Sequence, residues 1–136
     1  MKRISLKGVA IGNITDIVAT NVVLLPVMIY ILIAAGLPTD AGSVAELFKG
    51  STVFLVSGSI LGGICSVLGG YVSARIAKHD EVLNGALSSI LCVGSGAYSV
   101  ISGADPLWLH LAYLPLSPAL AALGGVLRSR QNARHR

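Results

Sequence analysis

Asp16 is the one acidic residue inside the long apolar stretches of this sequence, and it has polar neighbours at helical spacing. Asn13 lies three residues before it and Thr20 four residues after it, so the three side chains share one face of an α-helix. An unpartnered carboxylate within a membrane span costs about 3 kcal/mol, so we expect Asp16 to be protonated or partnered. Acids in such positions occur in proton and ion pathways, which makes this face the best candidate for chemistry.

Two interpretations of Asp16 remain open. In the first, it makes an interhelical hydrogen bond or ion pair that fixes packing, with Arg75 or the hydroxyl of a small residue as its partner. In the second, Asp16 titrates in a transport pathway that Asn13 and Thr20 line. The candidate polar site is therefore Asn13, Asp16, Thr20 and Arg75.

Enzyme chemistry has no counterpart in the sequence. There is no Ser/His/Asp set, no histidine-rich metal cluster and no pair of carboxylates at a common depth, so we predict neither catalysis nor a cofactor or metal. His79, Asp80 and Glu81 are neighbours in one turn, and we expect a solvated loop there. Cys65 and Cys92 are expected to be small buried hydrophobes, with a disulfide between them left open.

The elements that position these residues are long apolar stretches. Of the 136 residues 54% are hydrophobic and only 12% charged, and the mean hydropathy is +0.79. Each stretch reaches the roughly 20 residues that a bilayer crossing needs. The sequence therefore predicts an all-α polytopic membrane protein, a single domain over residues 1–136, with four spans at about 9–35, 51–77, 82–103 and 107–127. The basic N-terminus resembles a signal peptide, but polar residues interrupt its apolar core, so a retained first span is expected.

Basic residues lie almost entirely on one side of this four-span topology. Lys49 alone falls on the other side, and the remaining nine precede the first span, flank the turn after the second or follow the fourth. The positive-inside rule then predicts a multi-pass protein of the cell membrane with N- and C-termini in the cytoplasm. The arrangement favours contact with the lipid bilayer and its anionic headgroups rather than with nucleic acid.

Small residues at a spacing of four run along the second span, at Gly58, Gly62, Ser66, Gly70 and Ala74. Such a stripe lets a neighbouring helix backbone approach closely in lipid. The third span repeats the spacing at Ser88, Cys92 and Gly96, and only about six residues connect the two spans. We therefore expect a tight antiparallel hairpin of the second and third helices, with further small-residue faces that could pack a second copy or another membrane protein.

Two shorter segments carry local predictions. Between the first and second spans, Ser43 and Glu46 have the spacing of a capping box, which predicts a helix of one or two turns on the outer surface. After Leu127 the sequence is polar and cationic, and a disordered tail is expected.

The run GGYVSARIAKHDEVLNGAL, beginning at Gly69, resembles a group of small four-span bacterial membrane proteins of unknown function. The group shares a GGYxxxxIA run, a short charged turn and an Asn-Gly-Ala opening of the next span. The resemblance implies an integral membrane protein and brings no activity with it.

These observations predict an integral membrane protein that is not an enzyme, an accessory or interaction protein packed through small-residue helix faces. The alternative is a small proton- or ion-coupled transporter that uses Asp16, with Pro26, Pro115 and Pro118 permitting alternating exposure. An ion-coupled transporter requires Asp16 to titrate, whereas an accessory protein requires only that its helices pack.

Overall fold

A computed structural model describes residues 4–38, 40–101 and 107–134, and in these ranges the chain is all-α without a strand. The elements are α1 (Leu6–Ala34), α2 (Ala41–Gly50), α3 (Thr52–Ala77), α4 (Glu81–Leu87), α5 (Ile90–Ile101) and α6 (Leu107–Arg134). The all-α prediction is confirmed, and the first two predicted spans match α1 and α3 within three residues at each end.

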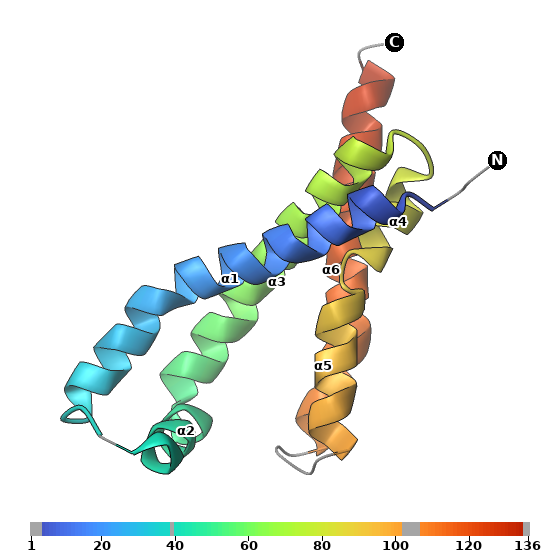
Figure 1. Ribbon diagram of the computed structural model, residues 1–136. Coiled ribbons are helices and arrows are strands. Elements are labelled where there is room, and N and C mark those ends of the chain that lie inside the picture. Colours follow the sequence, from blue (N-terminus) through green and yellow to red (C-terminus); the bar gives the residue numbers. More distant parts are fainter. Residues whose placement is uncertain (1–3, 39, 102–106, 135–136) are drawn as a thin grey trace.

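The helices form two groups that meet at one end of the molecule (Figure 1). α1 and α3 lie side by side and antiparallel, and α5 lies along α6. The groups converge at the end where both termini lie, with α4 packed against α6 there, and they separate toward the end that carries α2. The tightest contacts between helices are therefore concentrated near the termini.

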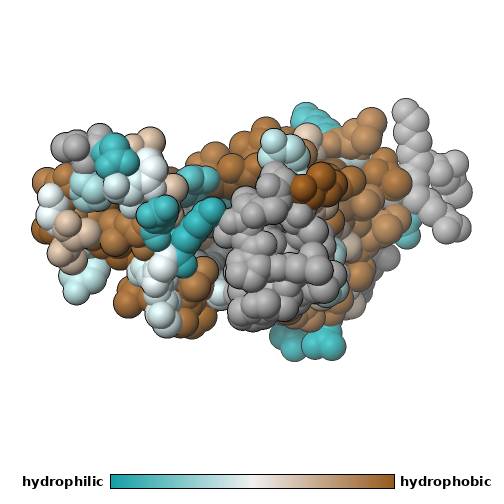
Figure 2. Space-filling model, turned by 90° about the horizontal axis from the view of Figure 1, so that it is seen from below, coloured by the Kyte–Doolittle hydropathy of each residue, from teal (hydrophilic) through white to brown (hydrophobic). Residues whose placement is uncertain are grey.

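α1 and α3 are long and apolar enough to cross a membrane. Their 29 and 26 residues correspond to about 43 Å and 39 Å of helix, against a hydrocarbon core of about 30 Å. Only 6% of the most apolar window of α1 and 22% of that of α3 are buried within the protein, so most of their apolar side chains face outward. On the face seen from below in Figure 2, hydrophobic residues, in brown, make up much of the coloured surface.

The third predicted span, 82–103, is not one continuous helix. It divides into α4 and α5 at Ser88 and Ser89, whose hydroxyl groups donate to the carbonyls of Gly85 at 2.7 Å and Ala86 at 2.9 Å. The amides of the two serines bond to the same carbonyls, which is a tighter turn than an α-helix makes. Local hydrogen bonding by serine competes here with the regular helix, which apolar content alone does not reveal.

The predicted hairpin of the second and third spans is also replaced by a different packing. α4 contacts the end of α3, but the small residues of α3 pack mainly against α1 and α6, while α5 packs against α6. A Cβ on Gly70 would collide with the carbonyl oxygen of Ala121, and one on Gly124 would lie 2.5 Å from the Tyr71 amide nitrogen. The close approach that the stripe predicts is therefore present, with α6 as the partner.

The predicted stripe residues divide into two sets. Ser66, Gly70 and Ala74 are buried at helix contacts, whereas Cβ atoms added to Gly58 and Gly62 would meet nothing within 4 Å. Ser88 is fully buried and Cys92 half-buried, while the surroundings of Gly96 lie outside the described residues. The inner half of the α3 stripe thus serves the fold, and its outer half has no partner among the described helices.

α6 continues to Arg134 instead of giving way to a disordered tail at Leu127. Two long-range hydrogen bonds hold its last turns: the Tyr71 hydroxyl donates to Gln131 Oε1 at 2.7 Å, and the Asn132 amide donates to Glu81 Oε1. The polar composition of this segment predicted disorder. The prediction was wrong because the partners that hold the segment are distant in sequence. Its contacts with α3 and α4 explain why it is helical.

Between α1 and α3, the predicted surface helix is α2, but its N-cap is Asp40 rather than Ser43. The Asp40 carboxylate accepts from the Ser43 amide at 2.8 Å. Hydrogen bonding by the Ser43 hydroxyl and then by this amide lowers the pKa of Asp40 from its usual 3.8. Because the ionised carboxylate is the stronger acceptor, the cap on the first turn of α2 is sensitive to acid.

We expect the N-cap of α2 to weaken as the pH falls below about 4. Because the folded-state pKa is lowered, the carboxylate contributes stability above the unfolded pKa of 3.8 and loses it as pH falls through the folded value. Amide hydrogen exchange of residues 41–44 measures this: exchange, corrected for its intrinsic pH dependence, should speed up in acid in the wild type. In Asp40→Asn it should show no such step. A step of equal size in Asp40→Asn would contradict the assignment.

Candidate functional site

Asp16 is the centre of a polar cluster buried among three helices. The residue is 2% exposed, and its carboxylate accepts hydrogen bonds from α1, α3 and α5. Ser66 Oγ donates to Oδ2 at 3.0 Å, Cys92 Sγ donates to the same oxygen at 3.5 Å, and Thr20 Oγ1 donates to Oδ1 at 3.4 Å. The three donors are neutral groups, so Asp16 joins the three helices through hydroxyl and thiol hydrogen bonds.

Close packing of α1 on α3 brings Asp16 to Ser66. Gly12 lies against Gly69, and a Cβ added to Gly12 would stand 2.8 Å from the Gly69 carbonyl oxygen and 2.6 Å from Ser73 Cβ. A Cβ on Gly69 would stand 2.9 Å from Asp16 Cβ. Glycine on both helices therefore permits a separation at which a short carboxylate reaches a short hydroxyl across the contact.

Of the other predicted polar residues, two lie near Asp16 and one does not. Asn13 is 3% exposed; its amide donates to the Val9 carbonyl at 3.1 Å, and its Oδ1 accepts from the Leu91 amide at 3.3 Å. Thr20 bonds directly to Asp16. Arg75 is exposed at the far end of α3 and is not part of the cluster. Of the two partners expected for Asp16, a small-residue hydroxyl is the one present.

Asn13 also explains how α5 is placed beside α1. The break at Ser88 and Ser89 leaves the first amides of α5 without intrahelical acceptors, and Asn13 Oδ1 accepts the Leu91 amide. Cys92 is the next residue, so this bond positions its thiol over Asp16. The sequence analysis assigned Ser66 and Cys92 to packing only. Their place in the cluster depends on how three helices are aligned with one another, and the spacing of residues within one helix does not predict that alignment.

A second buried polar group lies toward the termini, around Asn84, which is fully buried. Its Oδ1 accepts from the Ser5 amide at 2.7 Å, and its Nδ2 donates to the carbonyls of His79 and Asp80 at 3.0 and 3.1 Å. Its carbonyl accepts from the Ser73 hydroxyl at 2.8 Å. This residue ties the start of α1, the end of α3 and α4 together, and sequence reasoning had singled it out only within the resemblance motif.

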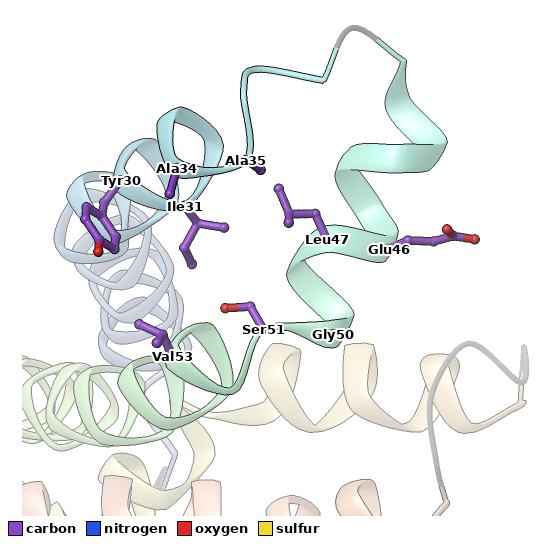
Figure 3. A pocket seen from close by; sticks show the side chains of 9 residues that line it. All are labelled: Tyr30, Ile31, Ala34, Ala35, Glu46, Leu47, Gly50, Ser51 and Val53. Carbon is purple, nitrogen blue, oxygen red and sulfur yellow. The ribbon is translucent and has the colours of Figure 1, made fainter.

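A hollow lies at the opposite end, between the end of α1, α2 and the start of α3. It has a volume of about 520 Å³ and mainly apolar walls. Figure 3 shows Leu47 of α2 directed toward Ile31 and Ala35, whereas the Glu46 carboxylate points away from the hollow. With its single carboxylate turned outward, the hollow offers no convergent polar groups for chemistry.

Within the described residues, no three histidine, cysteine, aspartate or glutamate side chains converge as a metal site would require. Cys65 and Cys92 are both free thiols, the first buried and the second half-buried. The Asp16 cluster combines one carboxylate acceptor with three donors and has no adjacent base that would activate a nucleophile. Its chemistry is that of a hydrogen-bonded acid, able to hold its helices together or to exchange a proton.

Comparison of the chain with protein-family models, with curated protein sequences and with solved structures gives no match. The resemblance that begins at Gly69 therefore stays a prediction. The structure defines the class of protein only as an all-α chain. Two of its helices have the length and composition to cross a membrane, and a polar cluster lies at their contact.

Proposed function

We propose that this chain is a multi-pass protein of the cell membrane with both termini in the cytoplasm. α1 and α3 are two of four crossings in this proposal, the broken pair α4 and α5 is the third, and the apolar part of α6 is the fourth. Three observations support it: the outward apolar surface of α1 and α3, the shared location of the two termini in Figure 1, and the basic residues near that end.

Within the membrane, the proposed function is non-enzymatic: the protein packs through small-residue helix faces against another membrane helix, in the simplest case that of a second copy. The observation that carries this is the division of the α3 stripe. Gly70 and Ala74 are used inside the chain, but Gly58 and Gly62 continue the same stripe and meet nothing. A hollow of about 200 Å³ lined by Phe54, Leu55, Gly58 and Ser59 accompanies this open half.

Gly62→Leu is expected to weaken self-association without destabilising the monomer. Leucine fills the face that a partner helix would approach, whereas no described atom outside the adjoining turns of α3 lies within 4 Å of the new Cβ. Energy transfer between donor- and acceptor-labelled copies in liposomes, measured against protein density, checks the first part. Denaturant unfolding checks the second part: the midpoint of the variant's transition should equal that of the wild type.

Ile60→Phe is the matched control, because Ile60 is 60% exposed and lies on the opposite side of α3. It should retain wild-type energy transfer. If Gly62→Leu also retained it across the density range, packing of copies through this face would be wrong. If both variants lost it equally, the effect would come from added bulk rather than from the glycine face.

Ion-coupled transport through Asp16 is the second candidate. The observation favouring it is that the buried carboxylate accepts hydrogen bonds from neutral donors on three helices, and none of the ion pairs found among the described residues involves it. Relative movement of those helices would change how many donors Asp16 keeps, which couples its protonation to their arrangement. Packing alone also explains these bonds, so this function ranks below the first.

A further inference from the structure

The inner half of α6 packs on two helices at once. One side contacts α4: a Cβ on Gly125 would lie 2.8 Å from Val82 Cα, and Asn132 bonds to Glu81. The other side contacts α3: Gly124 adjoins the Tyr71 amide, and Gln131 accepts from the Tyr71 hydroxyl. At 100° per residue, position 128 lies between these two sides. Arg128 therefore projects from the middle of the buried face of α6, toward the groove between α3 and α4.

The Nε atom of Arg128 lacks a hydrogen-bond acceptor among the described residues of this groove. Its Nε is buried and has no hydrogen-bond partner among the described residues. The side chain as a whole is partly exposed, so the outer part of the guanidinium group reaches the surface. Glu81, at the start of the α4 helix that α6 contacts, accepts a hydrogen bond from Asn132. A buried guanidinium donor of this kind is costly unless an acceptor completes it.

The surroundings of the groove are cationic. Arg75 follows Tyr71 by one turn of α3, and Lys78 ends that helix; both are exposed. Arg130 and Arg134 extend the positive charge along α6, which reaches the end of the molecule where both termini lie (Figure 1). An anionic ligand at Arg128 would be attracted by these charges before it reached the groove.

We propose that the groove of α3, α4 and α6 binds the phosphate of an anionic phospholipid headgroup, with Arg128 as the residue that contacts it. Arginine presents planar, forked donors that match phosphate oxygens, and Nε with one outer nitrogen forms such a fork. Tyr71 and Gln131 are bonded to each other beside it and close one wall.

A lipid, rather than a soluble phosphate, fits the position of the groove. Leu123 and Leu127 of α6, on the turns before Arg128, are 53% and 51% exposed and provide apolar surface for acyl chains. The proposal rests on the proposed function only in requiring the chain to lie in a bilayer, with this end at the anionic inner surface.

Charge-conserving variants test the site. Native mass spectrometry of the purified full chain in mild detergent, titrated with phosphatidylglycerol or phosphatidylcholine, measures lipid retention. Arg128→Lys keeps the charge but removes Nε and the fork, and should weaken phosphatidylglycerol retention about tenfold. Arg130→Lys is the matched control on the exposed side of α6 and should leave retention within twofold of wild type. Equal retention by Arg128→Lys and wild type would overturn the proposal.

A second measurement uses the unmodified protein, so that it does not depend on the variant folding. Phosphatidylglycerol should raise the unfolding temperature of the wild-type chain, and phosphatidylcholine should not. If millimolar inorganic phosphate gives the same rise and displaces the lipid, the site binds free phosphate and the lipid assignment is wrong. Equal effects of both lipids would likewise overturn it. Neither outcome would touch self-association through Gly62, which the energy-transfer experiment reports separately.

Discussion

Gly70→Ala is expected to be the most damaging single-methyl change in the described part of this chain. The added Cβ would collide with the backbone carbonyl of Ala121, and neither helix can relieve the contact by turning a side chain. Moving α6 away from α3 would also open the adjoining contact between Gly124 and Tyr71. We expect a loss of about 3 kcal/mol in the free energy of unfolding, at the upper end of overpacking effects.

Unfolding in mixed detergent micelles, followed by tryptophan fluorescence or circular dichroism, gives this free energy directly. Gly62→Ala is the control, because it makes the same substitution in the same helix with nothing within 4 Å. It should change stability by no more than about 1 kcal/mol, and in the stabilising direction, since alanine favours helix over glycine. Equal stabilities for the two variants would show that α3 and α6 do not approach as closely as described.

The second large effect is expected at Asp16. Asp16→Ala removes the acceptor of three hydrogen bonds and leaves the buried Ser66 hydroxyl without its partner. An unsatisfied buried donor costs about 1–3 kcal/mol, and the vacated space adds to that, so a loss of about 3 kcal/mol is expected. Asp16→Asn keeps an oxygen for Ser66 and should lose less than half as much.

The same pair of variants separates the two candidate functions. If Asp16 only holds the helices together, Asp16→Asn should form associated, stable protein like the wild type, and neither should carry protons across liposomes. If Asp16 transports protons, wild-type liposomes should acidify under an imposed gradient and Asp16→Asn liposomes should not. Wild-type proton flux in Asp16→Asn would end the transport hypothesis. Unchanged stability in Asp16→Ala would instead remove the structural role of the cluster.

The candidate site was predictable as far as a single helix could define it. Asn13, Asp16 and Thr20 share a face by spacing alone, and the structure places all three at or beside the polar cluster. Ser66 and Cys92 could not be assigned as partners, because their approach depends on how α1 and α5 lie against each other and against α3. Arg75 had the right charge to pair with Asp16, but it lies in the last turn of α3, more than two turns along the helix from Ser66.

Packing partners were less predictable than packing faces. A spacing of four small residues identifies where a backbone can approach, and Gly70 is indeed such a point, but the pattern is the same whichever helix arrives. The short connection between the second and third spans led to the prediction that the third span packs against this face. The serine pair that ends α4 redirects α5 toward α6, and Tyr71 and Glu81 then hold the last turns of α6. Each of these steps depends on contacts between residues far apart in sequence.

The position of α6 also has a consequence for biosynthesis. Its glycines fill the close contacts with both Gly70 of α3 and Gly85 of α4, yet α6 is the last of the described helices to leave the ribosome. Until it emerges, those two glycine surfaces stay uncovered on the nascent chain. The contacts through which α6 joins the ends of α3 and α4 therefore form late, when α6 docks.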